Sequence, residues 1–294
     1  MFQFLRNTEL IFILAFVFAL FIPEYSFNLK PLITPLLAIG IVLSLRDIDF
    51  NLRQLFSDKL IFVPFLLNYG IASAIPLLLA MLFITDTEVF AGFVILASVP
   101  SAAAIITYSN LFNSSTKNVV NGQIFIYLGS LVVAPLLVYF SLGTYLDISR
   151  LLQTLVILIL VPLIISRPCR RINNFVFDNS LVFINLIFFL VIYVAVGSNI
   201  EILIFDLTFY LVFSIIFVRN FVFGTLVYLI SKRLNFSKVD AVNNTLFSVY
   251  KNGGLSVVFA IELAGGYSIL APVMSVLLSA PLFLYLSFLF KRFN

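Results

Sequence analysis

Long apolar runs separated by short polar breaks cover the chain from end to end. A helix that crosses the hydrocarbon core of a bilayer needs about 20 mostly apolar residues. With charges, Pro and Gly as boundaries, the pattern predicts ten membrane spans. They are 8–23, 32–45, 60–84, 89–108, 119–141, 151–166, 178–197, 207–230, 241–264 and 268–290. The second and sixth are short for a full crossing, so we expect them to extend into flanking residues or to lie where the protein is thin.

The composition agrees with lipid as the solvent and excludes several kinds of site. Hydrophobic residues make up 62% of the 294 residues and charged residues only 10%, against about 25% charged in soluble domains. The chain has no His and a single Cys, Cys169, which rules out a His-based triad, a Cys/His zinc site and an internal disulfide. We therefore expect an all-α polytopic membrane protein without a cofactor, and not an enzyme.

The basic residues are distributed unevenly between the two predicted membrane faces. The face that carries both termini holds thirteen of them: Arg6, Arg46, Arg53, Lys59, Lys117, Arg167, Arg170, Arg171, Lys232, Arg233, Lys238, Lys291 and Arg292. The opposite face holds only Lys30 and Arg150. This bias predicts a multi-pass protein of the cell membrane with cytoplasmic termini. The net charge of +4 then reflects topology, and we expect no nucleic-acid partner.

Two predicted spans contain residues that interrupt a helix. The fourth includes Pro100 followed by Ser101, and the ninth includes Asn252, Gly253 and Gly254. Proline removes a backbone donor, and paired glycines favour an unwound segment. Each is the fourth span of its half, so residues 1–141 and 151–290 form two inverted five-helix repeats, as in secondary transporters. The alternative is a harmless kink at Pro100 and a close helix contact at the glycines.

Two cations lie inside apolar spans, where a charge is costly and normally faces a cavity or a partner. Lys251 falls near the middle of the ninth span, and Arg219, followed by Asn220, near the middle of the eighth. Lys251 is expected to meet a substrate carboxylate or to exchange protons, with a structural tether as the alternative. Arg219 fits an anion site or a structural pair equally well. Only Glu262 lies well inside a span on the acidic side, near its outer end.

The chain resembles the bile acid:sodium symporter family, within the wider superfamily of bile acid, arsenite and auxin-efflux carriers. An ungapped match runs from Arg219-Asn220 to Asn252-Gly253-Gly254, and a second from Asn68 through Pro100. The resemblance implies a panel domain (spans 1, 2, 6 and 7), a core domain (spans 3–5 and 8–10) and helices 4 and 9 that cross at their breaks. Substrate would bind near that crossing. Family members carry small organic anions, usually driven by sodium.

The departures from the family pattern concern the sodium ligands. Phe247 stands where the family has Glu, Lys251 where it has Gln, and Asn68 where it has Gln. A hard cation needs such oxygens. We therefore expect Lys251 to occupy the cation site. The residues predicted to surround it are Asn68, Gln123, Phe247, Ser248 and Tyr250. The residues predicted to bind substrate are Pro100, Ser101, Arg219, Asn220, Asn252, Gly253 and Gly254.

These observations predict a monomeric secondary transporter that moves a small organic anion by alternating access without sodium. One alternative is a conventional sodium symporter whose ligands are backbone carbonyls. Another, of a different class, is a transport-inactive or sensory membrane protein that keeps the fold. The substrate and the direction of transport are not encoded in any motif of the sequence.

Overall fold

The computed structural model describes residues 4–46, 61–114, 117–143, 146–170, 172, 175–202 and 206–292. Among these residues all regular structure is helical, and no strand occurs. Three of the predicted basic loop residues, Arg53, Lys59 and Arg171, lie outside the described residues. An all-α fold is therefore confirmed for the described part of the chain.

The main elements of the described residues are helical. In chain order they are α1 Thr8–Phe21, α2 Ser26–Leu29, α3 Ile33–Leu45, α5 Phe62–Leu66, η5 Leu67–Ala74, α6 Ile75–Phe83, α7 Thr87–Ser98, α8 Ala104–Leu111, α9 Lys117–Leu142, α10 Ile148–Leu155, η6 Val156–Leu160, α11 Val161–Cys169, α12 Phe175–Asp178, α13 Ser180–Gly197, α14 Leu207–Phe217, η8 Val218–Phe223, α15 Gly224–Arg233, α16 Lys238–Val249, α17 Gly253–Leu263, α18 Leu270–Leu277 and α19 Ser279–Arg292.

Seven helices in the described part are long and apolar enough to cross a membrane. They fall at the second, third, fifth, sixth, seventh, eighth and tenth predicted spans. Shorter apolar helices of 10–17 residues lie at the first, fourth and ninth. The second and sixth spans do extend into flanking residues, to Pro23–Leu45 and Ser149–Cys169. The count of ten crossings and the inverted repeat stay predictions, because three of the helices are short.

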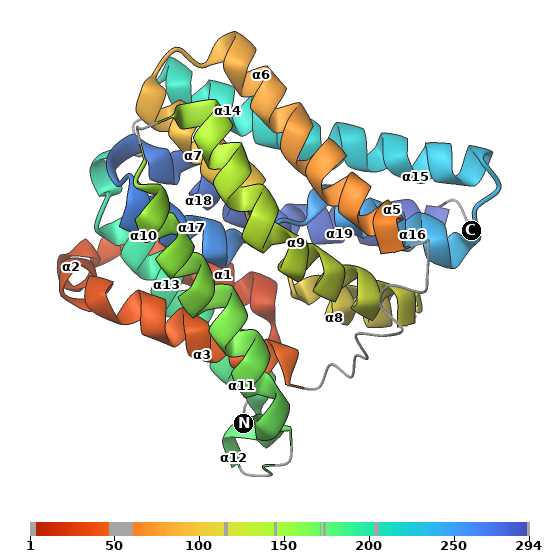
Figure 1. Cartoon of the computed structure of the whole chain (residues 1–294), viewed down its shortest axis with the longest axis horizontal. Helices are drawn as coiled ribbons and strands as arrows, with labels where there is room; N and C mark the ends of the chain where they lie inside the picture. The colour runs from red at the N-terminus through yellow and green to blue at the C-terminus, as the bar shows by residue number, and fades with distance from the viewer. Residues whose placement is uncertain are drawn as a thin grey trace.

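The helices pack in two groups. In the first, α13 packs against α1 and α3, and α11 against α3; Figure 1 shows these helices together around α1 and α13. In the second, α7 packs against α6, α9 and α18, while α15 packs against α16. The contact at α7 is close, since a Cβ on Gly92 would lie 2.2 Å from the Ser268 carbonyl oxygen. We name the first group, with the other helices of spans 1, 2, 6 and 7, the panel group, and the second, with the other helices of spans 3–5 and 8–10, the core group. Their independent motion is a proposal.

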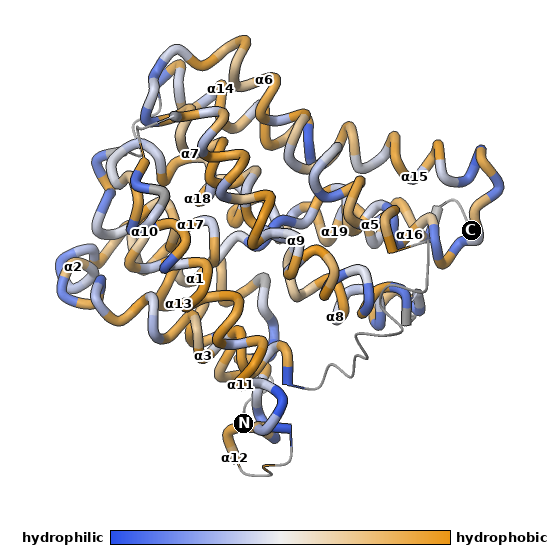
Figure 2. The backbone as a smooth tube through the Cα atoms, viewed as in Figure 1, coloured by the Kyte–Doolittle hydropathy of each residue, from blue (hydrophilic) through white to orange (hydrophobic). Residues whose placement is uncertain are grey.

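Polar residues collect at two opposite ends of the helices, while the helix bodies are apolar (Figure 2). At one end Arg46 donates to the carbonyl oxygens of Cys169, at 3.1 Å, and Ile172, at 2.9 Å. At the other end Glu262 of α17 accepts from Thr34 of α3 at 2.9 Å and pairs with Arg150 of α10 at 3.2 Å. We call these the Arg46 end and the Glu262 end.

Three spans contain a π-helical stretch that the hydrophobic pattern does not predict, and the stretch in the sixth span, η6, holds only apolar residues. The third span widens at η5, which carries Asn68 and Ser73, and the eighth at η8, which carries Arg219 and Asn220. A π-helical turn inserts an extra residue into the helix, and such turns occur often at functional sites. The turn at η5 places Ser73 against the Ala97 carbonyl of the fourth span, and the turn at η8 places Arg219 against Ser275 of α18.

Candidate substrate site at the helix crossing

The two broken helices meet at their breaks. The backbone N–H of Ala102 donates to the Tyr250 carbonyl at 3.1 Å, and that of Asn252 donates to the Pro100 carbonyl at 2.9 Å. Ser101 and Lys251 thus form an antiparallel bridge. Backbone groups that are freed at membrane depth must find partners within the protein. Each break supplies these partners to the other, which confirms the expected crossing.

The helix termini at the crossing are well defined. α7 ends at Ser98, before Pro100, and α17 begins at Gly253 with the side chain of Asn252 accepting from Leu255 N at 3.1 Å. The glycines also serve as close contacts, because a Cβ on Gly253 would lie 2.4 Å from Val276 and one on Gly254 would lie 2.5 Å from Phe188. Both interpretations of the glycine pair therefore hold. The N-terminus of α17, with its partial positive charge, therefore lies at the crossing.

The side chain of Lys251 is 5% exposed and extends into the core group. Its ammonium Nζ donates to Ser73 Oγ at 2.9 Å and to the Ala97 carbonyl at 3.1 Å. It also lies 4.7 Å from the centroid of the Tyr69 ring. The Ala97 carbonyl is available because α7 ends before a further turn could use it. Lys251 therefore ties the crossing to the third and fourth spans.

Arg219 and Asn220 are each 1% exposed and have fewer partners. Arg219 Nε donates to Asn220 Oδ1 at 2.8 Å, and Arg219 Nη2 donates to Ser275 Oγ of α18 at 2.8 Å. Arg219 Nη1 and Asn220 Nδ2 are buried without a hydrogen-bond partner among the described residues. The only ion pair recorded for the described side chains joins Arg150 to Glu262, away from the crossing. Neither buried cation has an acidic partner there.

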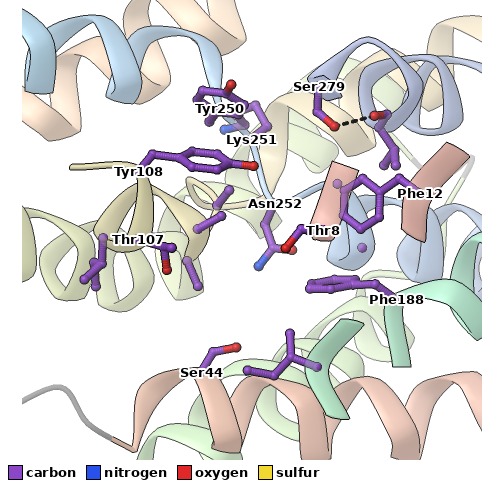
Figure 3. A pocket seen from close by; sticks show the side chains of 18 of the residues that line it. Thr8, Phe12, Ser44, Thr107, Tyr108, Phe188, Tyr250, Lys251, Asn252 and Ser279 are labelled. Atoms are coloured by element: carbon purple, nitrogen blue, oxygen red, sulfur yellow. Dashed lines mark hydrogen bonds between the residues drawn. The ribbon is translucent and has the colours of Figure 1, made fainter. Parts of the chain in front are cut away.

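A cavity of about 480 Å³ opens beside the crossing, between the panel group and the core group. Figure 3 shows Phe12 and Phe188 of the panel group opposite Tyr108 and Asn252 of the core group. Asn252 Nδ2 donates to Tyr127 Oη, another lining residue, at 2.9 Å. This volume lies in the range of small-molecule sites.

The cavity extends toward only one end of the molecule. Its lining reaches Thr8, Ser44 and Asn110, which lie near the helix termini at the Arg46 end. None of the described lining residues comes from the connections at the Glu262 end. The site is therefore reached from the Arg46 end in this conformation.

Seven of the predicted site residues line this cavity. They are Arg219, Asn220, Tyr250, Lys251, Asn252, Gly253 and Gly254. Ser101 and Gln123 instead bond to each other, with Ser101 Oγ donating to Gln123 Oε1 at 2.8 Å and Gln123 Nε2 to the Ser101 carbonyl at 2.9 Å. Pro100 does not line the cavity either, although its carbonyl forms part of the crossing.

Three further predicted residues lie in the packed interior of the core group, outside the cavity lining. Phe247 belongs to a buried apolar cluster, and Ser248 Oγ donates to the Thr245 carbonyl of its own helix at 2.7 Å. Asn68 is fully buried, and its side-chain amide has no hydrogen-bond partner among the described residues. No cluster of three or more His, Cys, Asp or Glu that could hold a metal occurs in the described part of the chain.

Sequence reasoning missed the acceptors that hold the cations. Lys251 donates to Ser73 and to the Ala97 carbonyl, and Arg219 donates to Ser275. Nothing in the local sequence distinguishes these acceptors from other small residues of an apolar helix. Ser73 lies five residues after Asn68 in the π-helical turn. A search for small hydroxyl residues near polar positions of neighbouring spans is the one sequence signal that points to them.

Comparison with known proteins agrees with this architecture. A search of curated proteins gave no match. A sequence model described as the sodium bile acid symporter family matches residues 29–207, more than half of the chain. The match includes the first break and ends before Arg219, so the second half of the crossing rests on the structure. On this evidence the chain belongs to the sodium bile acid symporter family.

Proposed function

We propose that this protein is a secondary transporter of a small organic anion in which the Lys251 ammonium takes the place of a coupling sodium ion. Members of the family are membrane transporters of bile-acid and organic-anion type. The observation that carries the proposal is the enclosure of Lys251 Nζ by Ser73 Oγ, the Ala97 carbonyl and the Tyr69 ring. Transport then runs without sodium, either coupled to protons or uncoupled.

The contacts of Lys251 resemble those of a bound monovalent cation. A hydroxyl oxygen and a carbonyl oxygen are ligands that sodium also accepts, and the ammonium supplies the same single positive charge. Phe247, where the family pattern has Glu, contributes no oxygen. Because the ammonium is covalently attached to the chain, it cannot dissociate during a transport cycle. A sodium gradient would therefore not drive transport.

The charge balance of the cavity favours an anionic substrate. Lys251 and Arg219 both line it, and neither forms an ion pair with a described carboxylate. Like charges that are buried together repel each other and cost free energy. An anion that enters the cavity offsets this cost, whereas a cation increases it.

The difference between the two ends of the molecule supports alternating access. The Arg46 end is open, while Glu262 joins the core group to two helices of the panel group through Thr34 and Arg150. An outward-open state would have to break these contacts.

Cysteine labelling tests this step in a Cys169→Ser background, with Val258→Cys on α17 as the reporter. Adding Glu262→Gln removes the ion pair, and a thiol reagent on the Glu262 side should then label Val258→Cys about fivefold faster. The factor follows because an exposed ion pair contributes about 1 kcal/mol or less. Equal labelling rates contradict this part of the proposal.

The deciding experiment is uptake of labelled carboxylates, including cholate, octanoate and 2-oxo acids, by proteoliposomes that contain the purified protein. We expect equal rates in sodium and in potassium buffers. A strict sodium requirement would return the chain to the conventional sodium symporters and make Lys251 structural. Absence of uptake and of thermal stabilisation by every carboxylate would favour the inactive or sensory alternative.

A further inference from the structure

Arg219 and Asn220 form an incompletely paired, positively charged group at the cavity. Arginine has five N–H donors, of which Nε and Nη2 each have a described acceptor while Nη1 has none. Asn220 accepts from Nε and leaves its own Nδ2 unpartnered. Buried polar groups are nearly always paired, so two unpaired donors on adjacent residues require an explanation.

The second buried arginine of the structure shows what a structural role looks like. Arg46 is 8% exposed, donates to two backbone carbonyls and lies 4.4 Å from the centroid of the Phe177 ring. Its neighbours supply acceptors that suit a guanidinium. The neighbours of Arg219, a residue that lines the cavity, supply one amide oxygen and one hydroxyl and leave Nη1 buried without an acceptor among the described residues. Packing alone does not explain Arg219.

We infer that Arg219 Nη1 and Asn220 Nδ2 bind the carboxylate of a monocarboxylate substrate, and we rest this on the organic-anion transport proposed above. A guanidinium fits a carboxylate through two parallel N–H donors. Ser275 and the Asn220 amide oxygen hold the guanidinium in place, which leaves Nη1 as the donor for the ligand.

A single carboxylate with an apolar body suits the rest of the cavity. Two of the three ammonium donors of Lys251 already have acceptors in Ser73 and Ala97, whereas the Arg219 group combines a positive charge at the cavity with donors that lack a described partner. Phe12, Phe188 and Ile192 line the wall on the panel side. A second carboxylate placed against this wall would be buried without partners at a high cost.

An internal carboxylate tests the site directly. Asn220→Asp places an acidic group at the oxygen that already accepts from Arg219 Nε at 2.8 Å. In the purified protein we expect the new carboxylate to neutralise Arg219 and so to raise the Tm of the empty protein. Carboxylate binding should weaken about 10- to 100-fold, which is the effect of losing a charge-assisted hydrogen bond. Asn185→Asp is the matched control. Asn185 is also buried and lines the cavity but bonds to Thr8 and the Leu5 carbonyl, so the new charge there should lower the Tm.

The probes are octanoate, 4-phenylbutyrate and cholate, each compared with its uncharged amide by calorimetry and by Tm. We expect the wild type to bind at least one acid and not its amide, and Arg219→Met to lose this preference while its own Tm does not fall. Arg46→Met, which removes an arginine held by two backbone carbonyls and an aromatic ring, should lower the Tm and keep the preference. If Asn220→Asp and Arg219→Met bind the acid within twofold of the wild type, the carboxylate site is elsewhere and the transport proposal stands. If the wild type binds no acid, both fail.

Discussion

The two buried cations beside the cavity differ in how completely the protein surrounds them. Lys251 Nζ has a hydroxyl, a carbonyl and an aromatic face around it, supplied by two other spans. Arg219 has one neighbouring amide and one hydroxyl, and part of its guanidinium remains unpaired. Lys251 lies at the break of the ninth span, and Arg219 lies in the π-helical stretch of the eighth. Both lack an acidic partner among the described residues.

This difference separates a cation that belongs to the structure from one that is kept for a ligand. A buried charge with complete hydrogen bonds strengthens the contact between the elements it joins, whereas one with open donors destabilises the empty protein. Functional sites are commonly places where a protein gives up stability. On this basis Lys251 connects the crossing to the core group, and Arg219 remains available to an anion.

Removal of the Lys251 charge should have the largest effect. Lys251→Met loses two hydrogen bonds from a charged donor, of about 1.5–3 kcal/mol each, and leaves the Ala97 carbonyl without this donor. At about 2–4 °C per kcal/mol, we expect the Tm to fall by about 6–24 °C and transport to be lost. Lys238→Met, at an exposed position on α16, is the control and should leave both unchanged. A shift of 2 °C corresponds to a loss of about 1 kcal/mol or less. A Tm within 2 °C of the wild type would therefore contradict this interpretation of Lys251.

A double exchange should convert the tethered cation into an ordinary ion site. Phe247→Glu combined with Lys251→Gln restores the residue types of the family pattern and leaves Ser73 Oγ and the Ala97 carbonyl without the ammonium donor. We expect sodium to raise the Tm of this variant and to stimulate uptake about tenfold, because a ligand that binds only the folded state stabilises it. Lys251→Gln alone lacks the carboxylate and should respond less. Sodium-insensitive behaviour of the double variant would argue that the ammonium does not occupy a former ion site.

Loss of one acceptor should weaken the Lys251 cluster without destroying it. Ser73→Ala removes the hydroxyl that accepts from Nζ at 2.9 Å, and we expect a Tm lower by about 3–6 °C. Ser98→Ala is the matched control, since Ser98 is equally buried but donates only to the Ile95 carbonyl of its own helix. Thermal unfolding of both variants in the same detergent measures the difference. Equal shifts would show that Ser73 acts only as a packed side chain.

The smallest effect is expected at the hydroxyl that positions Arg219. Ser275→Ala removes the acceptor of Nη2 at 2.8 Å and lets the guanidinium move, so carboxylate affinity should fall about two- to fivefold, the loss of one modest hydrogen bond. Ser279→Ala, which loses only a bond to the Val276 carbonyl, should bind as the wild type does. Calorimetric titration with the acid that binds the wild type most tightly compares the two. An unchanged affinity for Ser275→Ala would mean that Asn220 alone orients Arg219.

The sequence by itself determined the positions of the helices, because apolar runs long enough for a bilayer leave little choice of structure. It also placed both breaks, since Pro100 and the pair Gly253-Gly254 act on the local backbone wherever they occur. The two intramembrane cations stood out for the same reason: a charge in an apolar run is conspicuous without any knowledge of its neighbours.

Only the tertiary structure decided what these features do. The pairing of Ala102 with Tyr250 and of Asn252 with Pro100 joins residues about 150 positions apart in the chain, and no local pattern encodes such contacts. Ser73 and Ser275 gain their roles from helices that pack beside them, and the π-helical turns depend on that packing. The roles of Lys251 and Arg219 differ because their environments differ, and a side chain's environment is a property of the folded molecule.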